Sequence, residues 1–133
     1  MRENWDFYRG DIYIADLNRG AIGYDGNHVQ GGTRPVVLLQ NNISNFYAPT
    51  LVVVPITSKV GKKPTLPTHC YIPRRAGLNT DGIALAEQIT TIDKRQCVKY
   101  LGRLDRETVE RIKAAALSAI GEDIDIPDEM EAP

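Results

Sequence analysis

Short apolar runs alternate with turn residues along most of this chain, and this pattern constrains the fold more than any other feature of the sequence. The runs are rich in β-branched residues and have the length of strands. Two of them, 35–40 and 51–54, are continuously apolar and predict buried strands, separated by a polar turn around Asn41 and Pro49. We expect strands in six places: 11–17, 35–40, 51–54, 68–72, 82–86 and 98–102.

One long helix is predicted after the strands. Asp105 is a good N-cap, Leu104 before it can pack on Val109 as a hydrophobic staple, and Gly121 ends the periodic segment. The residues that recur at helical spacing are Val109, Ile112, Ala116 and Ile120. Short strands followed by one packing helix predict a mainly β fold, namely a small, strongly curved β-barrel with a C-terminal helix against it.

Length and charge set the domain organisation. The chain has 133 residues, which is enough for one domain of ordinary size and rules out a two-domain enzyme. We expect a barrel domain with its packing helix at 1–121 and a flexible acidic tail at 122–133. Residues 1–120 carry a net charge of +5, and residues 121–133 carry −6. The basic excess is small, so charge alone does not distinguish a polyanion-binding surface from an ordinary one.

The expected compartment is a reducing cytoplasm, without contact to a membrane. The longest strongly apolar run, Leu51 to Ile56, is interrupted by Pro55 and is far too short to span a bilayer. The N-terminus lacks the apolar core of a secretory signal. Cys70 and Cys97 lie in no metal-ligand or redox pattern and are expected to be buried thiols.

Several classes of enzyme lack their signature in this sequence. No phosphate-binding P-loop, GxSxG elbow or HExxH zinc motif occurs, and only two histidines, His28 and His69, are present. The glycines of the loop at 18–34 do not form a dinucleotide fingerprint. In this loop, Asp25 and Asn27 flank a glycine, which is typical of a turn rather than of a metal site.

Two segments remain as candidates for a catalytic or binding site. The first is 30–35, a Gly-rich stretch that runs into a buried strand and puts Arg34 at the mouth of that strand. The second is 55–59, where another buried strand ends in Thr57, Ser58 and Lys59. Strand ends on a rigid barrel hold reactive groups in place, and we expect these two ends to be neighbours. The alternative is that the Gly, Thr and Arg residues of these two segments only help to form turns.

Four ordered motifs resemble the MazF/PemK family of toxin endoribonucleases over about residues 9–121. They are Arg9–Tyr13 with Ala15–Leu17, Gln30–Val36, Pro55–Ser58, and Glu87–Ile89 with Thr91–Lys94. The resemblance implies a homodimer of SH3-like barrels that cleaves single-stranded RNA without a metal or another cofactor. It also implies an antitoxin whose C-terminal segment occupies the RNA groove. The family's catalytic arginine and threonine fall on Arg34 and Thr57.

The resemblance suggests further contacts with RNA. Secondary candidates for binding bases or backbone are Gln30, Gly31, Ser58, Lys59 and Gln88. His69 is either an RNA contact or a structural strand residue. The loop at 18–29 is longer than in many family members and places His28 before Gln30, as either a proton-transfer group or an exposed loop residue.

Two other functions fit the same fold. One is a CcdB-like inhibitor of DNA gyrase, which cleaves nothing; the presence of Arg34 with Thr57 favours the nuclease. The other is a non-catalytic module that binds RNA or an antitoxin in the same groove. For the acidic tail, one hypothesis is repulsion of RNA or transient cover of the basic groove, and the alternative is a merely solvated segment.

Overall fold

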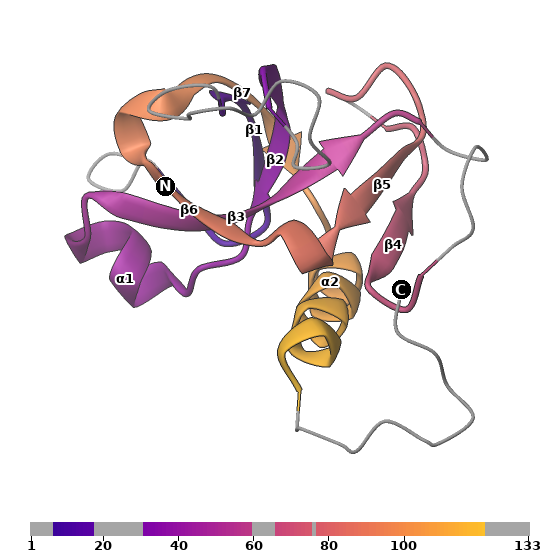
Figure 1. Ribbon diagram of the computed structural model, residues 1–133. Coiled ribbons are helices and arrows are strands. Elements are labelled where there is room, and N and C mark those ends of the chain that lie inside the picture. Colours follow the sequence, from indigo (N-terminus) through magenta and orange to yellow (C-terminus); the bar gives the residue numbers. More distant parts are fainter. Residues whose placement is uncertain (1–6, 18–30, 60–65, 76, 122–133) are drawn as a thin grey trace.

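The computed structural model describes residues 7–17, 31–59, 66–75 and 77–121, and Figure 1 shows them as a strongly curved sheet with a long helix packed beneath it. The strands are β1 (Asp11–Asp16), β2 (Thr33–Leu38), β3 (Thr50–Thr57), β4 (His69–Ile72), β5 (Gly82–Leu85), β6 (Thr90–Asp93) and β7 (Cys97–Arg103). The α-helices are α1 (Asn42–Tyr47) and α2 (Arg106–Ile120), and the 3-10 turns are η1 (Ala86–Gln88) and η2 (Lys94–Gln96).

The strand β3 organises the sheet. The strand order is β4-β5-β3-β2-β1-β7, and every pairing is antiparallel. One edge of β3 pairs with β2; on the other edge, its first half pairs with β6 and its last two residues pair with β5. Because β3 serves two partners in succession, the sheet curls around it. The predicted mainly β fold with a C-terminal helix is confirmed, although the described strands stop short of a closed barrel.

Two apolar cores lie on opposite faces of the sheet. The core beneath α2 takes Val37 and Val54 from the central strands, and the core inside the curl takes Val36 and Val53. All four side chains are fully buried. Alternate residues of one strand point to opposite faces, so a strand buried on both sides must be apolar at every position. This explains why the two runs at 35–40 and 51–54 lack polar interruptions.

The long helix begins and ends where the sequence predicts. The carboxylate of Asp105 accepts a hydrogen bond from the amide of Thr108 at 3.2 Å, and Gly121 follows the last turn with φ +39°. Val109 and Ile112 are buried against the sheet as expected. Ile120, however, is 72% exposed, so the prediction that it packs on the core is wrong. The sheet ends before the last turn of the helix, and helical spacing alone cannot show where the partner surface stops.

The segment predicted as a polar turn forms the short helix α1, so that prediction is wrong. Asn41 caps the helix by accepting a hydrogen bond from the amide of Ser44 at 2.9 Å. Asn45 is buried and donates to the backbone oxygen of Gln40 at 3.0 Å. Side-chain amides thus hold this helix, and a six-residue helix stabilised in this way carries no apolar period.

Strand boundaries also differ from the predictions. The strand β6 is missing from them, because only Ile92 of its four residues is buried. The strand β2 begins at Thr33, two residues before the predicted start at Pro35, so Arg34 lies within the strand, opposite Ala15. No helix in the described part of the chain has the length and apolar character that crossing a membrane requires.

Both cysteines are free thiols. Cys70 is buried as predicted, whereas Cys97 is half-buried. Burial raises the pKa of Cys97 to about 11. Burial also raises the pKa of Cys70, and the nearby positive charge of Arg111 offsets part of that rise. Both thiols therefore stay protonated at neutral pH, where a thiol reacts slowly.

Candidate functional site

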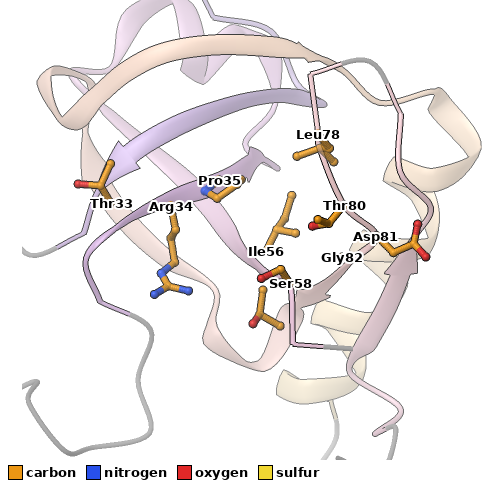
Figure 2. A pocket seen from close by; sticks show the side chains of 10 residues that line it. Thr33, Arg34, Pro35, Ile56, Ser58, Leu78, Thr80, Asp81 and Gly82 are labelled. Atoms are coloured by element: carbon orange, nitrogen blue, oxygen red, sulfur yellow. The ribbon is translucent and has the colours of Figure 1, made fainter. Parts of the chain in front are cut away.

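The two segments singled out in the sequence meet in one pocket of about 260 Å³. The start of β2 forms one wall, the end of β3 forms the floor, and the turn that leads into β5 forms the opposite wall. Figure 2 shows Arg34 on one side and Thr80 with Gly82 on the other, with Ile56 and Ser58 between them. The lining residues are Thr33, Arg34, Pro35, Ile56, Thr57, Ser58, Leu78, Thr80, Asp81 and Gly82. The prediction that the two strand ends are neighbours is therefore confirmed.

The register of the sheet brings Arg34 and Thr57 together. Val36 of β2 pairs with Pro55 of β3. Two further residues along each strand, toward the open end of this pair, lie Arg34 and Thr57. Side chains two residues apart point to the same face of a strand, so both groups project on the face that Val36 and Pro55 share. Their meeting is thus a consequence of backbone pairing and not of a flexible loop.

The guanidinium of Arg34 is anchored by the chain just before β2. Its Nε donates a hydrogen bond to the backbone oxygen of Gly31 at 2.6 Å. Gly32 lies between the two residues with φ +75°, in the region that favours glycine, and this turn brings the carbonyl of Gly31 back onto the arginine. The planar guanidinium is thereby fixed in orientation at the pocket, and its remaining donors project from Cζ in the same plane.

Thr57 is the last residue of β3 and only 8% of it is exposed. Its Oγ1 accepts a hydrogen bond from the backbone amide of Lys59 at 3.2 Å. A hydroxyl that accepts a bond from an amide keeps its own proton for donation. The chain turn at Ser58 therefore orients the Thr57 hydroxyl, while Ser58 itself is exposed at the pocket and Lys59 is exposed beside it.

The wall formed by the turn into β5 is the part of the site that the sequence did not indicate. Gly82 is required there by close packing, because a Cβ would lie 2.7 Å from Cγ2 of Ile56 and 3.3 Å from the backbone oxygen of Thr57. Thr80 adds a fourth hydroxyl to those of Thr33, Thr57 and Ser58. No motif marks Thr80 in the sequence; only the pairing of β5 with β3, which is not visible before folding, places it at the pocket.

Asp81 borders the pocket, but Figure 2 shows its carboxyl group pointing away from Arg34. One oxygen accepts the hydroxyl of Tyr71 at 2.8 Å and the other accepts the amide of Arg74 at 2.7 Å. The hydrogen bond from the Arg74 amide, followed by that from Tyr71, lowers the pKa of Asp81. The same contact with Asp81 raises the pKa of Tyr71. Asp81 is therefore an ionised clamp that ties β4 to the turn before β5.

His69 lies outside the pocket. It opens β4 opposite Leu85, three pairs along from the Ile72–Gly82 pair at the pocket end. Its Nε2 lies 3.2 Å from Oε2 of Glu87, and the other Glu87 oxygen accepts the hydroxyl of Thr68 at 2.9 Å. His69 is therefore paired with Glu87 in this structure, and a contact with RNA stays a prediction.

Of the other residues predicted to bind RNA, some lie at the pocket and one lies away from it. Gly31 and Lys59 flank the pocket through their bonds to Arg34 and Thr57, whereas Gln88 lies in η1, away from its lining. Gln30 and His28 lie outside the described residues. Within the part of the chain that the structure describes, no three His, Cys, Asp or Glu residues gather as metal ligands would. The pocket instead offers one cation and several hydroxyls, a set of donors suited to phosphate oxygens.

Comparisons with known proteins agree with this geometry. Residues 8–120 match the family model described as PemK-like, MazF-like toxin of type II toxin-antitoxin system. The chain is 41% identical over 108 residues to Endoribonuclease EndoA of Bacillus subtilis (strain 168), which covers 80% of this chain and 88% of EndoA.

Solved structures give the same result. An endoribonuclease in complex with its cognate antitoxin, from a mycobacterial species, is 27% identical with a TM-score of 0.68, covering 90% of this chain and 99% of that one. MazF from Deinococcus radiodurans shares the fold with a TM-score of 0.69 at 20% identity, covering 87% of this chain and 97% of that one. With a family model that matches most of its length and a relative this similar, the chain belongs to the PemK-like, MazF-like toxins of type II toxin–antitoxin systems.

Proposed function

We propose that this toxin endoribonuclease cleaves single-stranded RNA at the pocket between β2, β3 and β5, without a metal ion, with Arg34 and Thr57 as its catalytic residues. The observation that carries the proposal is that one pocket is lined by both an anchored guanidinium, on Arg34, and an oriented hydroxyl, on Thr57, at the adjoining ends of the paired strands β2 and β3. Similarity to EndoA favours cleavage over the two alternatives, a gyrase inhibitor and a binding module without turnover.

The reaction follows from the chemistry of RNA. The 2′-oxygen attacks the adjacent phosphorus and forms a new O–P bond, while the bond from phosphorus to the 5′-oxygen breaks. The 2′-hydroxyl loses its proton, and the leaving 5′-oxygen gains one. The products are a 2′,3′-cyclic phosphate and a 5′-hydroxyl. The protein must align the attack, stabilise the charge on the phosphorane oxygens and support the transfer of protons.

Arg34 serves the second of these tasks. A guanidinium binds two phosphate oxygens through parallel N–H donors, and its bond to Gly31 holds that fork in place before the substrate arrives. Thr57 donates one more hydrogen bond, from a hydroxyl that the Lys59 amide has already oriented. Groups that are fixed before the reaction stabilise the transition state without a cost of reorganisation.

Other residues bind the rest of the RNA. Ser58, Lys59 and Gly31 flank the scissile phosphate, and Gln30, which precedes Gly31 in the sequence, is a further candidate for binding RNA. Gln88 and His69 contact nucleotides farther from the cut, because neither lines the pocket. RNA reaches such a site as a single strand, since base reading requires unstacked bases.

The proposed partners are an antitoxin and a second copy of the chain. A mycobacterial relative has been solved with its cognate antitoxin, and we expect an antitoxin of this protein to cover the same pocket. A homodimer is expected because the fold is small and twofold pairing is the commonest way to cover apolar surface. Light scattering at micromolar concentration should give the mass of a dimer, and the mass of a monomer would contradict this expectation.

The nuclease proposal is tested with purified protein and a long single-stranded RNA in EDTA. We expect cuts at a defined set of sites, each leaving a 2′,3′-cyclic phosphate and a 5′-hydroxyl. In a matched RNA, a single 2′-deoxy sugar on the 5′ side of one cut removes the nucleophile and should abolish that cut alone. Cleavage of the 2′-deoxy substrate would exclude this chemistry, and the absence of all cutting would favour one of the two alternatives.

A further inference from the structure

One row of paired residues leads from the pocket across the hairpin of β4 and β5. Thr57 of β3 pairs with Ile83 of β5, and Ile83 pairs in turn with Tyr71 of β4. Residues paired in neighbouring strands point to the same face of a sheet. Because neighbouring strands lie ~4.8 Å apart, Tyr71 stands on the face of Thr57 at a distance of ~10 Å across the sheet.

Tyr71 is accessible on this face. Its neighbours Cys70 and Ile72 point the other way and are buried in the core under α2. Tyr71 itself is 51% exposed. No aromatic ring in the described part of the chain stacks on it, in contrast to Tyr13, whose ring packs against Phe7. A large aromatic side chain thus lies open on the side of the hairpin that faces away from the core.

The position of the Tyr71 ring is fixed by its hydroxyl. The hydroxyl donates to Oδ2 of Asp81 at 2.8 Å, and the amide of Arg74 donates to Oδ1 of the same carboxylate at 2.7 Å. Asp81 lines the pocket, and Figure 2 shows it beyond Thr80 as seen from Arg34. A ring that is held before its ligand arrives loses little conformational entropy on binding. The pocket wall therefore presents the ring in a set orientation.

Arg74 adds a positive charge beside this ring. It is exposed, and no carboxylate of the described residues forms an ion pair with it, whereas Nη1 of the next residue, Arg75, lies 3.3 Å from Oδ1 of Asp105. After the hydrogen bonds from the Arg74 amide and from Tyr71, the charge of Arg74 is a further cause that lowers the pKa of Asp81. An accessible ring beside a cation suits a nucleotide of a single strand, since the ring stacks on the base and the cation binds the backbone.

We propose that Tyr71 stacks on a base that flanks the cut and that Arg74 binds the phosphate next to this base. The inference rests on the proposed function, because it needs the scissile phosphate at Arg34 and Thr57. His69 lies two residues before Tyr71 on the same face of β4, so Tyr71 joins the cut to the more distant nucleotide contact proposed for His69. Every base has a face that can stack, so Tyr71 holds the RNA in place without selecting its sequence.

The test uses RNAs in which the base at one position beside a mapped cut is replaced by an abasic sugar. Each RNA carries a 2′-deoxy sugar at the cut, so fluorescence anisotropy measures binding without cleavage. At one flanking position, loss of the base should weaken binding to the wild type by about five- to a hundredfold, the effect of one base stacked on an aromatic ring. Tyr71→Val should weaken binding of the intact RNA by a similar factor. At that position the abasic sugar should cost this variant nothing further, whereas at other positions it should cost both proteins the same.

Two further variants separate stacking from a structural role. Tyr71→Phe keeps the ring and loses the bond to Asp81, so it should retain most of the affinity, whereas a purely structural clamp would be impaired as much as by Tyr71→Val. Valine favours strands, so Tyr71→Val should fold, and circular dichroism checks this. Tyr47→Val is the matched control, because Tyr47 is 79% exposed on α1, across the molecule from β4 in Figure 1, and should bind RNA as the wild type does.

The phosphate contact of Arg74 is tested by the salt dependence of binding. Loss of one contact with a single strand should lower the slope of log affinity against log salt by about 0.7, so Arg74→Gln should show this change. Tyr71→Val should leave the slope unchanged. The matched control Arg95→Gln removes an exposed cation that is bound to Asp93, and should change neither the affinity nor the slope.

The outcomes separate this inference from the nuclease proposal. If the wild type cuts RNA but abasic sugars cost it no more than they cost Tyr71→Val at any position, Tyr71 stacks on no base and this inference alone is wrong. Equal losses in Tyr71→Phe and Tyr71→Val would give Tyr71 a structural role and overturn it as well. An unchanged slope in Arg74→Gln would overturn the phosphate contact. A protein that cuts no RNA fails the nuclease test first, and this inference with it.

Discussion

The two ends of the hairpin formed by β4 and β5 carry different chemistry. At one end lies the pocket, where Arg34 and Thr57 are anchored by backbone groups and lie beside a hollow. At the other end His69, whose side chain is 9% exposed, pairs with Glu87, and that carboxylate also binds Thr68. The side chain most often associated with general acid–base catalysis is thus held in a local pair, and an arginine with a threonine occupies the cavity.

Residue type is therefore a weaker guide to a candidate reaction site than the position of the residue in the fold. A histidine whose two ring nitrogens contact Glu87 and the amide of Leu66 has little capacity left for proton transfer to a substrate. Arg34, by contrast, lines the pocket with a planar guanidinium whose Nε is bound to the carbonyl of Gly31. Substitutions at the two ends of the hairpin should therefore differ in their effects on cleavage and on stability.

The largest effect is expected at Arg34. Loss of a contact made mainly in the transition state costs roughly 2.7–4 kcal/mol, so Arg34→Ala should slow single-turnover cleavage by about a hundred- to a thousandfold while RNA affinity falls much less. Arg34→Lys keeps the charge but loses the fork, and should not restore the full rate. The matched control is Arg95→Ala, an exposed arginine paired with Asp93. A wild-type rate for Arg34→Ala would remove the pocket from the reaction.

A smaller effect, on stability, is expected at Gly82. A Cβ there meets Ile56 Cγ2 at 2.7 Å, so Gly82→Ala overpacks the floor of the pocket and should lower the free energy of unfolding by ~1–3 kcal/mol. The urea midpoint measures this loss. Adding Ile56→Leu, which deletes the Cγ2 methyl, should recover part of it. If Gly82→Ala is as stable as the wild type, the close packing of β5 on β3 is not what fixes the pocket.

His69→Ala should affect the opposite end of the hairpin. It removes the partner of Glu87 and should cost about 1 kcal/mol of stability, the usual net worth of one hydrogen bond. Because His69 lies outside the pocket, the cleavage rate at saturating enzyme should change only about two- to threefold, whereas a filter-binding assay should show weaker RNA binding. A rate loss as large as that of Arg34→Ala would place the histidine among the catalytic groups.

The smallest effect is a pH dependence at the start of α2. Hydrogen bonds from the hydroxyl and the amide of Thr108 lower the pKa of Asp105 to about 2. A carboxyl whose pKa is lower in the folded state stabilises the fold above its unfolded pKa, so this contribution should be lost as the pH falls from about 4 to 2. Asp105→Asn keeps a capping side chain but cannot titrate. Its urea midpoints should therefore fall less steeply over this interval, and identical pH profiles would contradict the assignment.

Much of the fold could be predicted because local and global signals agree. The continuous apolar runs at 35–40 and 51–54 are buried on both faces, and α2 runs from its Asp105 cap to Gly121. Strand β6 could not be predicted, because only one of its four residues is buried, and two further features also escaped prediction. The helix α1 depends on side-chain amides rather than an apolar period, and Ile120 extends beyond the sheet that would have covered it.

The candidate site also contains residues that the sequence indicates and residues that it does not. Arg34 and Thr57 stand at the ends of recognisable strands, so motifs and strand pattern both indicate them. Thr80 and Gly82 reach the pocket only because β5 pairs with the last two residues of β3. That pairing joins residues far apart in the chain and leaves no periodic trace in either segment. The His69 pair with Glu87 is likewise a long-range contact that a single sequence does not reveal.

We propose that Arg34 and Thr57 act together on one phosphorane, and a double-mutant cycle on single-turnover cleavage measures the coupling between them. The variants are Arg34→Ala, Thr57→Ala and the double variant, each shown to be folded by circular dichroism, with Thr57→Ser as the hydroxyl-retaining control. Because groups that stabilise one transition state are not additive, the double variant should be far less impaired than the product of the two single losses. Thr57→Ser should keep most of the rate. Losses that multiply independently, or wild-type rates in both single variants, would contradict a joint site.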